Sequence, residues 1–128
     1  MTIVRRLEVL CVSSEASDLQ AYLDYGEVLE WNVTIAHSLD LARSLASQAQ
    51  FDAVVVHHAN SDLAWFEQTD VIRDGNGLNS ATPVLFVSMN SDEASSFELR
   101  PHAICRYQGR PMLLSAFKSY ISGMIERS

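Results

Sequence analysis

The chain has 128 residues, of which 48% are apolar and 20% are charged, as expected for one soluble globular domain. Nine Lys and Arg residues against sixteen Asp and Glu residues give a formal net charge of −7. This acidic balance argues against sequence-independent binding of nucleic acid and against docking on an anionic membrane surface.

The sequence contains no membrane-spanning segment and no signal peptide, and its two cysteines lie in apolar runs. No apolar run approaches the roughly 20 residues of a membrane span, and the first residues lack the apolar stretch and cleavage site of a signal peptide. We therefore expect a cytoplasmic protein. Cys11 and Cys105 lie inside apolar, strand-like runs, which favours two buried free thiols over a disulfide or a metal site.

The first half of the chain predicts two strand–helix units. Residues 7–12 (LEVLCV) form a strand, and residues 17–27 form an amphipathic helix with Ser17 as its N-cap and Gly26 as its stop. The stretch EWNVTIAHS then alternates apolar and polar residues with the period of a strand. Ser38 is the expected N-cap of the next helix, which carries one apolar face.

The second half repeats the pattern. Residues 51–56 form a strand in which every residue after Asp52 is apolar. Side chains on both faces of the strand are therefore apolar, which indicates burial on both faces and hence a parallel sheet. A helix around residues 63–73, a strand VLFVSM, a short helix closed by Pro101 and a strand AICRY follow. The final helix starts with Pro111 in its first turn. Its expected stripe is Leu113 or Leu114, Phe117, Ile121, and Met124 or Ile125.

Five alternating strand–helix units predict one α/β domain over residues 1–128, a parallel sheet with helices on both faces. In such sheets ligands bind beyond the carboxyl ends of the strands. We therefore expect any site among the polar residues that follow the strands. These are Ser13, Ser14, His57, His58, Ser88 and the segment YQGRP.

Several kinds of site are excluded at this edge. The stretch VSSEASD has no glycine and so no phosphate-binding loop, and the chain has no Gly-x-Ser-x-Gly elbow. Histidines 37, 57, 58 and 102 show no metal-ligand spacing. No nucleophile–base pair supports an enzyme. We expect no cofactor and no metal.

The chain resembles, over essentially its full length, the receiver domain of two-component response regulators. Tyr107 stands three positions before Arg110-Pro111 and an amphipathic helix, like the family's aromatic switch residue before its Lys-Pro. Ser88 follows its strand as the family's hydroxyl residue does. The resemblance implies a flavodoxin-like sheet of five parallel strands in the order 2-1-3-4-5, with five helices.

The sequence departs from the family at the phosphorylation pocket. The family holds magnesium with an acidic pair after the first strand and phosphorylates an aspartate at the end of the third. Those positions are Ser13, Ser14 and His57 here, and Arg110 replaces the family's lysine. Since magnesium usually needs one or two carboxylates, we expect a pseudo-receiver that cannot form aspartyl phosphate. Asp52 lies at the wrong end of its strand; rescue by Glu15 or Asp62 is the alternative.

For His57 we expect an imidazole hydrogen-bonded to Ser13, Ser14 or Ser88. A role as phosphate carrier is the sharper alternative, but no phosphotransfer motif surrounds it. A protonated His57 near Arg110 would form a like-charge pair, which would depress its pKa.

By resemblance, signalling and dimerisation use the face made by residues 92–100, 103–107 and 112–125. Exposed apolar or aromatic side chains suit such an interface, whereas Leu113, Phe117 and Ile121 are expected in the core. The expected interface and switch residues are Tyr107, Phe97, Tyr120 and Met124.

Three hypotheses remain. The first is a phosphorylation-independent module that binds a protein or a second copy of itself, as the N-terminal part of a larger regulator. The second is a sensor that holds a small ligand or anion in the degenerate pocket. The third is an enzyme or a working phosphoreceiver.

Overall fold

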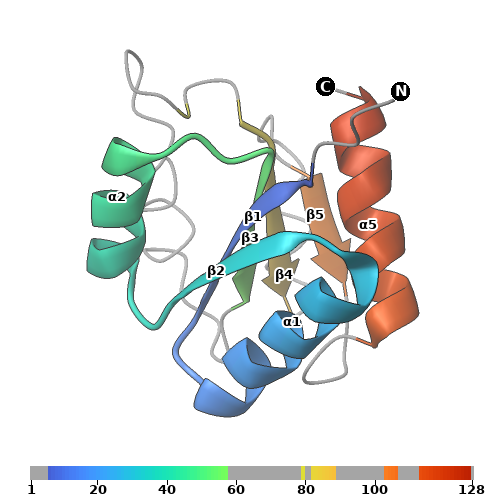
Figure 1. The fold of residues 1–128 in the computed structure, drawn as a ribbon, viewed down its shortest axis with the longest axis horizontal. Coiled ribbons are helices and arrows are strands. Elements are labelled where there is room, and N and C mark those ends of the chain that lie inside the picture. The colour runs from blue at the N-terminus through green and yellow to red at the C-terminus, as the bar shows by residue number, and fades with distance from the viewer. Residues whose placement is uncertain (1–5, 58–78, 80–81, 89–102, 107–112, 128) are drawn as a thin grey trace.

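The computed structural model describes residues 6–57, 79, 82–88, 103–106 and 113–127, and Figure 1 traces the chain through them. Strands and helices alternate over residues 8–57, as predicted. The elements are β1 (Glu8–Ser13), α1 (Ala16–Leu29), β2 (Asn32–Ala36), α2 (Leu39–Gln48), β3 (Ala53–His57), β4 (Val84–Ser88), β5 (Ala103–Arg106) and α5 (Leu114–Arg127). The helices predicted around residues 63–73 and 92–100 lie outside the described residues.

All five strands join one parallel sheet in the order β2-β1-β3-β4-β5, which confirms the predicted topology. β1 pairs with β2 on one side and β3 on the other, and Cys11 lies opposite Ile35 and Val55. The chain returns to the start of β2 and β3 by way of α1 and α2. All carboxyl ends therefore meet at one edge of the sheet.

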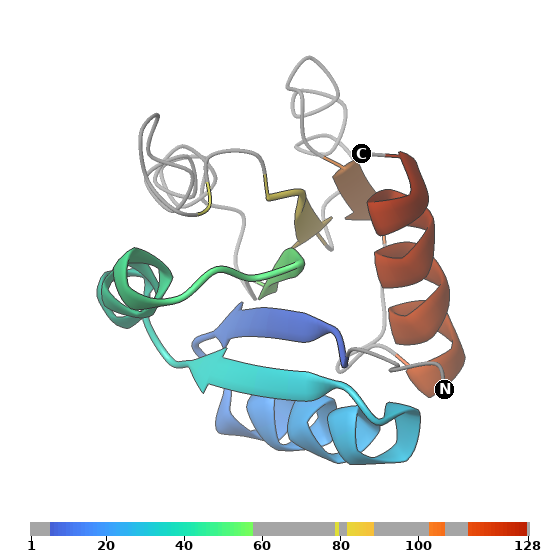
Figure 2. The same cartoon turned by 45° about the horizontal axis from the view of Figure 1, so that its top comes forward.

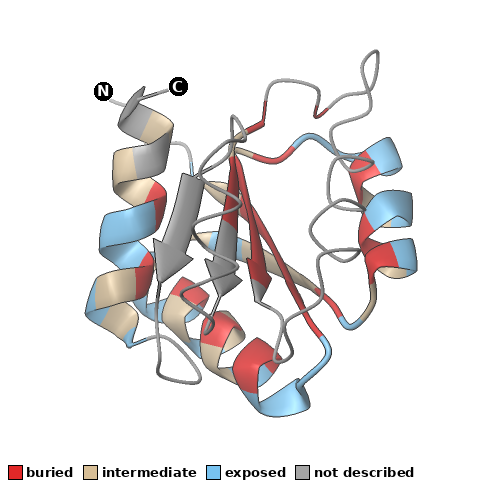
Figure 3. Cartoon of the chain, turned by 180° about the vertical axis from the view of Figure 1, so that it is seen from behind, coloured by how far each residue is buried: buried red, intermediate tan, exposed pale blue. Residues whose placement is uncertain are grey.

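The sheet is covered on both faces. On one face Leu10, Val12, Val54 and Val56 pack with Leu39, Ala42 and Ala46 of α2. On the other face Val9, Cys11 and Val55 pack with Tyr22 of α1 and with Phe117 and Ile121 of α5. Figure 2 shows α1 beneath β1 and β2, and Figure 3 shows the buried strands between helices whose outer sides are exposed. This two-sided burial confirms the prediction made from the apolar run of β3.

An aromatic cluster joins α1, α5 and the start of β2. The rings of Tyr22 and Phe117 stack with centroids 5.1 Å apart, and Tyr25 and Trp31 lie tilted against Phe117 at 5.5 and 5.9 Å. Offset and tilted aromatic pairs of this kind each add about 0.5–1.5 kcal/mol beyond the area they bury. Phe117 is therefore the point at which the last helix is attached to the first half of the chain.

Both predicted ends of α1 were wrong. The helix begins at Ala16 with Glu15 as N-cap, so Ser17 lies inside it. It also runs through Gly26 to Leu29, and Glu30 closes it in the left-handed region (φ 59°). Gly26 has a packing role instead: a Cβ there would stand 2.6 Å from Cγ2 of Val33 on β2. The glycine is what allows α1 to approach the sheet closely.

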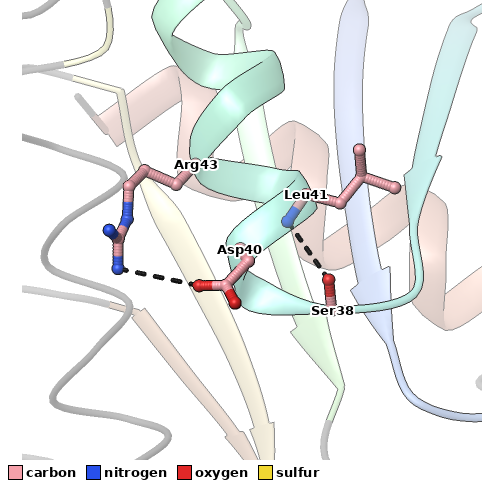
Figure 4. Close-up of polar contacts among 4 residues, drawn as sticks. All are labelled: Ser38, Asp40, Leu41 and Arg43. Atoms are coloured by element: carbon pink, nitrogen blue, oxygen red, sulfur yellow. Dashed lines mark hydrogen bonds and ion pairs between the residues drawn. The ribbon is translucent and has the colours of Figure 1, made fainter.

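The start of α2 follows the prediction. Ser38 is its N-cap, and its hydroxyl accepts a hydrogen bond of 3.1 Å from the backbone N–H of Leu41, as Figure 4 shows. This contact satisfies one of the donors that every helix leaves unpaired at its N-terminus. Asp40 and Arg43 form an exposed ion pair of 4.0 Å, which contributes little.

Two predictions for the last helix were wrong and two were confirmed. α5 begins at Leu114, three residues beyond Pro111, and Leu113 is 65% exposed rather than part of the core. Phe117 and Ile121 are fully buried, as expected. The stripe on the helix was correct, but Leu113 precedes the first turn and so does not follow its periodicity.

A buried polar network holds the amino edge of the sheet, opposite the carboxyl ends. The Asn79 side chain accepts from the N–H of Phe51 (2.8 Å) and the hydroxyl of Thr82 (2.9 Å), and it donates to the carbonyls of Ala46 and Ala49 (2.7 and 2.9 Å). One amide thus links the end of α2 to the starts of β3 and β4.

Replacing Gly26 with alanine tests the close approach of α1 to β2. Since Val33 must move to admit the new methyl group, we expect Gly26→Ala to lower the free energy of unfolding by about 1–3 kcal/mol. Gly123 is the matched control, because nothing lies within 4 Å of a Cβ built there. Gly123→Ala should stabilise by roughly 0.5–1 kcal/mol in urea unfolding, through helix propensity and chain entropy. Equal effects of the two substitutions would contradict the packing role of Gly26.

Removing the Asn79 amide tests the network at the amino edge. Asn79→Ala removes the side-chain partner of the Phe51 N–H and of the Ala46 and Ala49 carbonyls, so we expect a loss of about 2–4 kcal/mol in urea unfolding. Ser47→Ala removes an exposed hydroxyl that bonds only locally to Ser44 and should change stability by less than about 0.5 kcal/mol. If Asn79→Ala unfolded at the same urea concentration as the wild type, the network would not hold this edge.

Candidate functional site at the carboxyl edge of the sheet

The strand ends bring several predicted residues to one edge. Ser13 is the last residue of β1 and lies opposite His57, the last residue of β3. Ser88 ends β4 one position beyond the partner of His57 and lies opposite Arg106 at the end of β5. Ser13, His57 and Ser88 therefore occupy neighbouring backbone positions, as sequence reasoning expected. The directions of the His57 and Ser88 side chains lie outside what the structure describes.

Ser13 is a buried residue with an engaged hydroxyl. Its side chain is fully shielded from solvent. The hydroxyl donates to Oδ2 of Asp18 at 2.9 Å and accepts from the backbone N–H of Glu15 at 3.1 Å. Ser13 thus lies between the end of β1 and the start of α1, and it has hydrogen-bonding partners in both directions.

Asp18 is the site residue that sequence reasoning missed. Its side chain is only 1% exposed, although it sits in the first turn of α1. With Glu15 as N-cap, Asp18 is the third helical residue, a position from which a side chain reaches back to the helix start. The sequence carries no capping-box pattern here, because the N-cap is Glu15 rather than Ser or Thr, so no local signal pointed to Asp18. The carboxyl edge therefore does contain a carboxylate, on the helix rather than on the strand.

The nearby acidic candidates are placed differently. Glu15 is exposed, as is Ser14 before it, whereas Ser13 and Asp18 on either side are buried. Asp52 precedes β3 at the opposite edge, as expected, where its Oδ2 accepts from the backbone N–H of Glu8 at 2.8 Å. Asp52 is thus engaged with β1 and does not belong to this site. Asp62 lies outside the described residues.

The remaining predicted residues are described only in part. Tyr120 lies on α5 and is 41% exposed. Met124 belongs to the same helix, but its side chain is not described. Phe97, Tyr107 and Arg110 lie outside the described residues.

The Ser13 hydroxyl offers little to a magnesium ion, because it is engaged in hydrogen bonds on both sides. Magnesium prefers octahedral oxygen ligands, with one or two carboxylates among them. Here the Ser13 hydroxyl points its proton at Asp18 and faces a backbone N–H with a lone pair, next to the positive end of the α1 dipole. Within the described ranges, no group of three or more His, Cys, Asp or Glu side chains is placed to hold a metal ion. Nor does any helix there have the length and apolarity needed to cross a membrane.

Cys11 is buried in the centre of β1, in agreement with its predicted role as a free thiol. Burial raises the pKa of the Cys11 thiol above its ordinary value, because the thiolate would lose its hydration. The side chain is therefore an inert part of the core. Cys105 lies in β5, and its side chain is not described.

A groove lies away from the carboxyl ends of the strands. It has a volume of about 380 Å³ and runs between the outer side of α1 and the start of β2. Arg6 crosses there to Asn32 with a hydrogen bond of 3.2 Å, and Asn32 donates in turn to Glu8 at 2.7 Å. These polar contacts tie β1 to the edge strand, so the groove is partly closed by its own side chains.

Neither a family model nor a curated protein matches the sequence, but solved structures match the fold. The chemotaxis protein CheY4 of Vibrio cholerae is similar with a TM-score of 0.77 and 16% identity, over 94% of this chain and 99% of that one. The receiver domain of a Pseudomonas aeruginosa sensor histidine kinase, whose structure holds magnesium in its active-site cleft, gives 0.73 and 15%, over 95% and 99%. A receiver domain from Methylobacillus flagellatus gives 0.73 and 14%, over 94% and 99%.

The chain therefore has the flavodoxin-like fold of response regulator receiver domains, as the resemblance implied. The similarity extends over nearly the whole of each chain, so the match is to an entire domain. At these identities the comparison establishes the fold, and function has to be argued from the residues at the edge of the sheet.

Proposed function

We propose that this chain is an atypical receiver domain of two-component signalling that is not phosphorylated in the usual way and that acts through protein contacts. Its pocket would comprise Ser13, Ser14, His57, Ser88 and Arg110. The domain would be a cytoplasmic module of a larger regulator, with no direct contact to nucleic acid or membrane.

The observation that carries this proposal is the pairing of Ser13 with His57 at the ends of two adjacent central strands. Phosphoryl transfer to a carboxylate at the end of β3 needs that carboxylate and a cation to neutralise the phosphate oxygens. Here His57 takes the place of the carboxylate at the end of β3. At the end of β1, where a ligand of the cation would lie, the Ser13 hydroxyl is already hydrogen-bonded to Asp18 and to the N–H of Glu15. Asp18 is a poor substitute nucleophile, because it is buried and one of its oxygens is hydrogen-bonded to Ser13.

A domain that is not controlled by phosphate would have to signal through contacts between its surface and another protein. Tyr120 is a partly exposed aromatic residue on α5, whereas Phe117 and Ile121 on the same helix are fully buried. Leu113, just before α5, adds exposed apolar area. Exposed aromatic and aliphatic side chains are enriched in the centres of protein interfaces. We propose a homodimer or partner interface that combines α5 with β5 and residues 92–100, with Phe97, Tyr107 and Met124 contributing.

Chemical phosphorylation tests the loss of receiver chemistry. Incubated with radiolabelled acetyl phosphate and magnesium, the wild-type chain should incorporate no label. His57→Asp restores a carboxylate at the end of β3, and it tests whether the missing nucleophile alone accounts for the result. Hydroxylamine-labile phosphate on the wild type would contradict the proposal, and acid-labile phosphate on His57 would favour the phosphate-carrier alternative.

The oligomeric state tests the proposed interface. We expect a dimer by light scattering, unchanged by magnesium or beryllofluoride. Tyr120→Lys places a charge in the interface and should raise the dimer dissociation constant at least about tenfold, or about 1.4 kcal/mol. Ser119→Lys introduces the same charge at a neighbouring exposed position of α5 and is the matched control. A monomer that one small anion stabilises against heat would instead favour the sensor hypothesis.

A further inference from the structure

The start of α1 is satisfied in an unusual way. A helix leaves its first four N–H groups without intrahelical partners, and the N-cap side chain normally accepts one of them. Here, among the described residues, the Glu15 side chain makes no capping hydrogen bond. The backbone N–H of Glu15 itself donates to Ser13, which lies two residues earlier at the end of β1.

The Ser13 hydroxyl is also bonded to the first turn of the helix. It donates to Asp18, whose own N–H returns to the carbonyl of Glu15 at 3.1 Å. In an ordinary capping box, the side chain of the third helical residue bonds the N-cap N–H directly. Here a hydroxyl from the strand stands between the two groups. The strand end and the first turn of α1 are therefore joined by a relay of two hydrogen bonds through one buried oxygen.

The polar groups described at this junction bond one another. The Asp18 carboxylate lies in the first turn of α1, where the helix dipole favours a negative group, and a hydrogen bond to a charged acceptor is stronger than a neutral one. A carboxylate at position 13 would change this arrangement. Two buried carboxylates at hydrogen-bonding distance must share a proton or recruit a cation.

We infer that the Ser13–Asp18 relay takes the structural place of a bound divalent cation and holds the β1–α1 junction in one geometry whether or not such a cation is present. This inference extends the proposed function, since it explains how the pocket stays ordered after losing its acidic pair. Asp18 acts as a positioning residue for the end of β1. The role of Ser13 is likewise structural, because its hydroxyl holds the end of β1 to the start of α1.

Thermal unfolding of the wild type and of three variants tests the relay. Each protein is measured in EDTA and in magnesium chloride at matched ionic strength. The wild type should have the same Tm in both. Ser13→Ala should lower Tm by about 4–8 °C in both, while Ser14→Ala, at the exposed neighbour, should leave it unchanged. Ser13→Asp should be less stable than the wild type in EDTA and should regain stability in magnesium, because the second carboxylate then has a cation to share.

Hydrogen exchange on the wild type gives a reading that requires no variant to fold. The amide of Glu15, which the relay bonds, should exchange equally slowly in EDTA and in magnesium. Faster exchange in EDTA, or a rise in the wild-type Tm with magnesium, would overturn the inference. So would equal Tm values for Ser13→Ala and Ser14→Ala. A cation effect without phosphate incorporation would sink this inference alone, whereas incorporation without a cation effect would sink only the proposed function.

Discussion

Burial of the central strands on both faces is the constraint on which the rest of this structure depends. Residues 9–12 of β1 and 53–56 of β3 have essentially no exposed surface, and their side chains alternate between the α2 face and the α1/α5 face. A strand in this position has no room for a charged side chain along its length. Polar chemistry is therefore confined to the strand ends, where Ser13 and His57 are the first polar residues after each apolar run.

Among the described residues, side chains of the chain itself bond buried polar groups at both edges of the sheet. At the amino edge, Asn79 and Thr82 bond the backbone of the α2–β3 connection. At the carboxyl edge, Ser13 and Asp18 do the same for the β1–α1 connection. Networks of this kind rigidify a fold, because any unpaired member is costly in a low-dielectric interior. The described junction between β1 and α1 is thus held by the chain's own hydrogen bonds.

The helix that carries the proposed interface residue Tyr120 is firmly packed against the first half of the chain. Phe117 anchors that helix in the aromatic cluster with Tyr22 and Trp31, so the exposed Tyr120 one turn away is carried on a firmly packed element. Rigid presentation lowers the entropic cost of binding a partner. In the proposed phosphorylation-independent role, this preorganised surface would make the contacts with a partner.

The sequence by itself determined the alternation of strands and helices over residues 8–57, the parallel sheet, the burial of Phe117 and Ile121, and the cap at Ser38. Each of these depends on local periodicity or on contacts within one turn. The tertiary structure alone decided that Asp18 is buried, that Gly26 lies inside α1 and that Leu113 is exposed. Those outcomes depend on contacts between different elements or on where a helix begins: Val33 of β2 leaves no room for a Cβ at position 26, and Ser13 at the end of β1 bonds the Asp18 carboxylate. A periodic pattern identifies the face that a helix buries, but the neighbouring elements determine where the helix starts and what its first turn contacts.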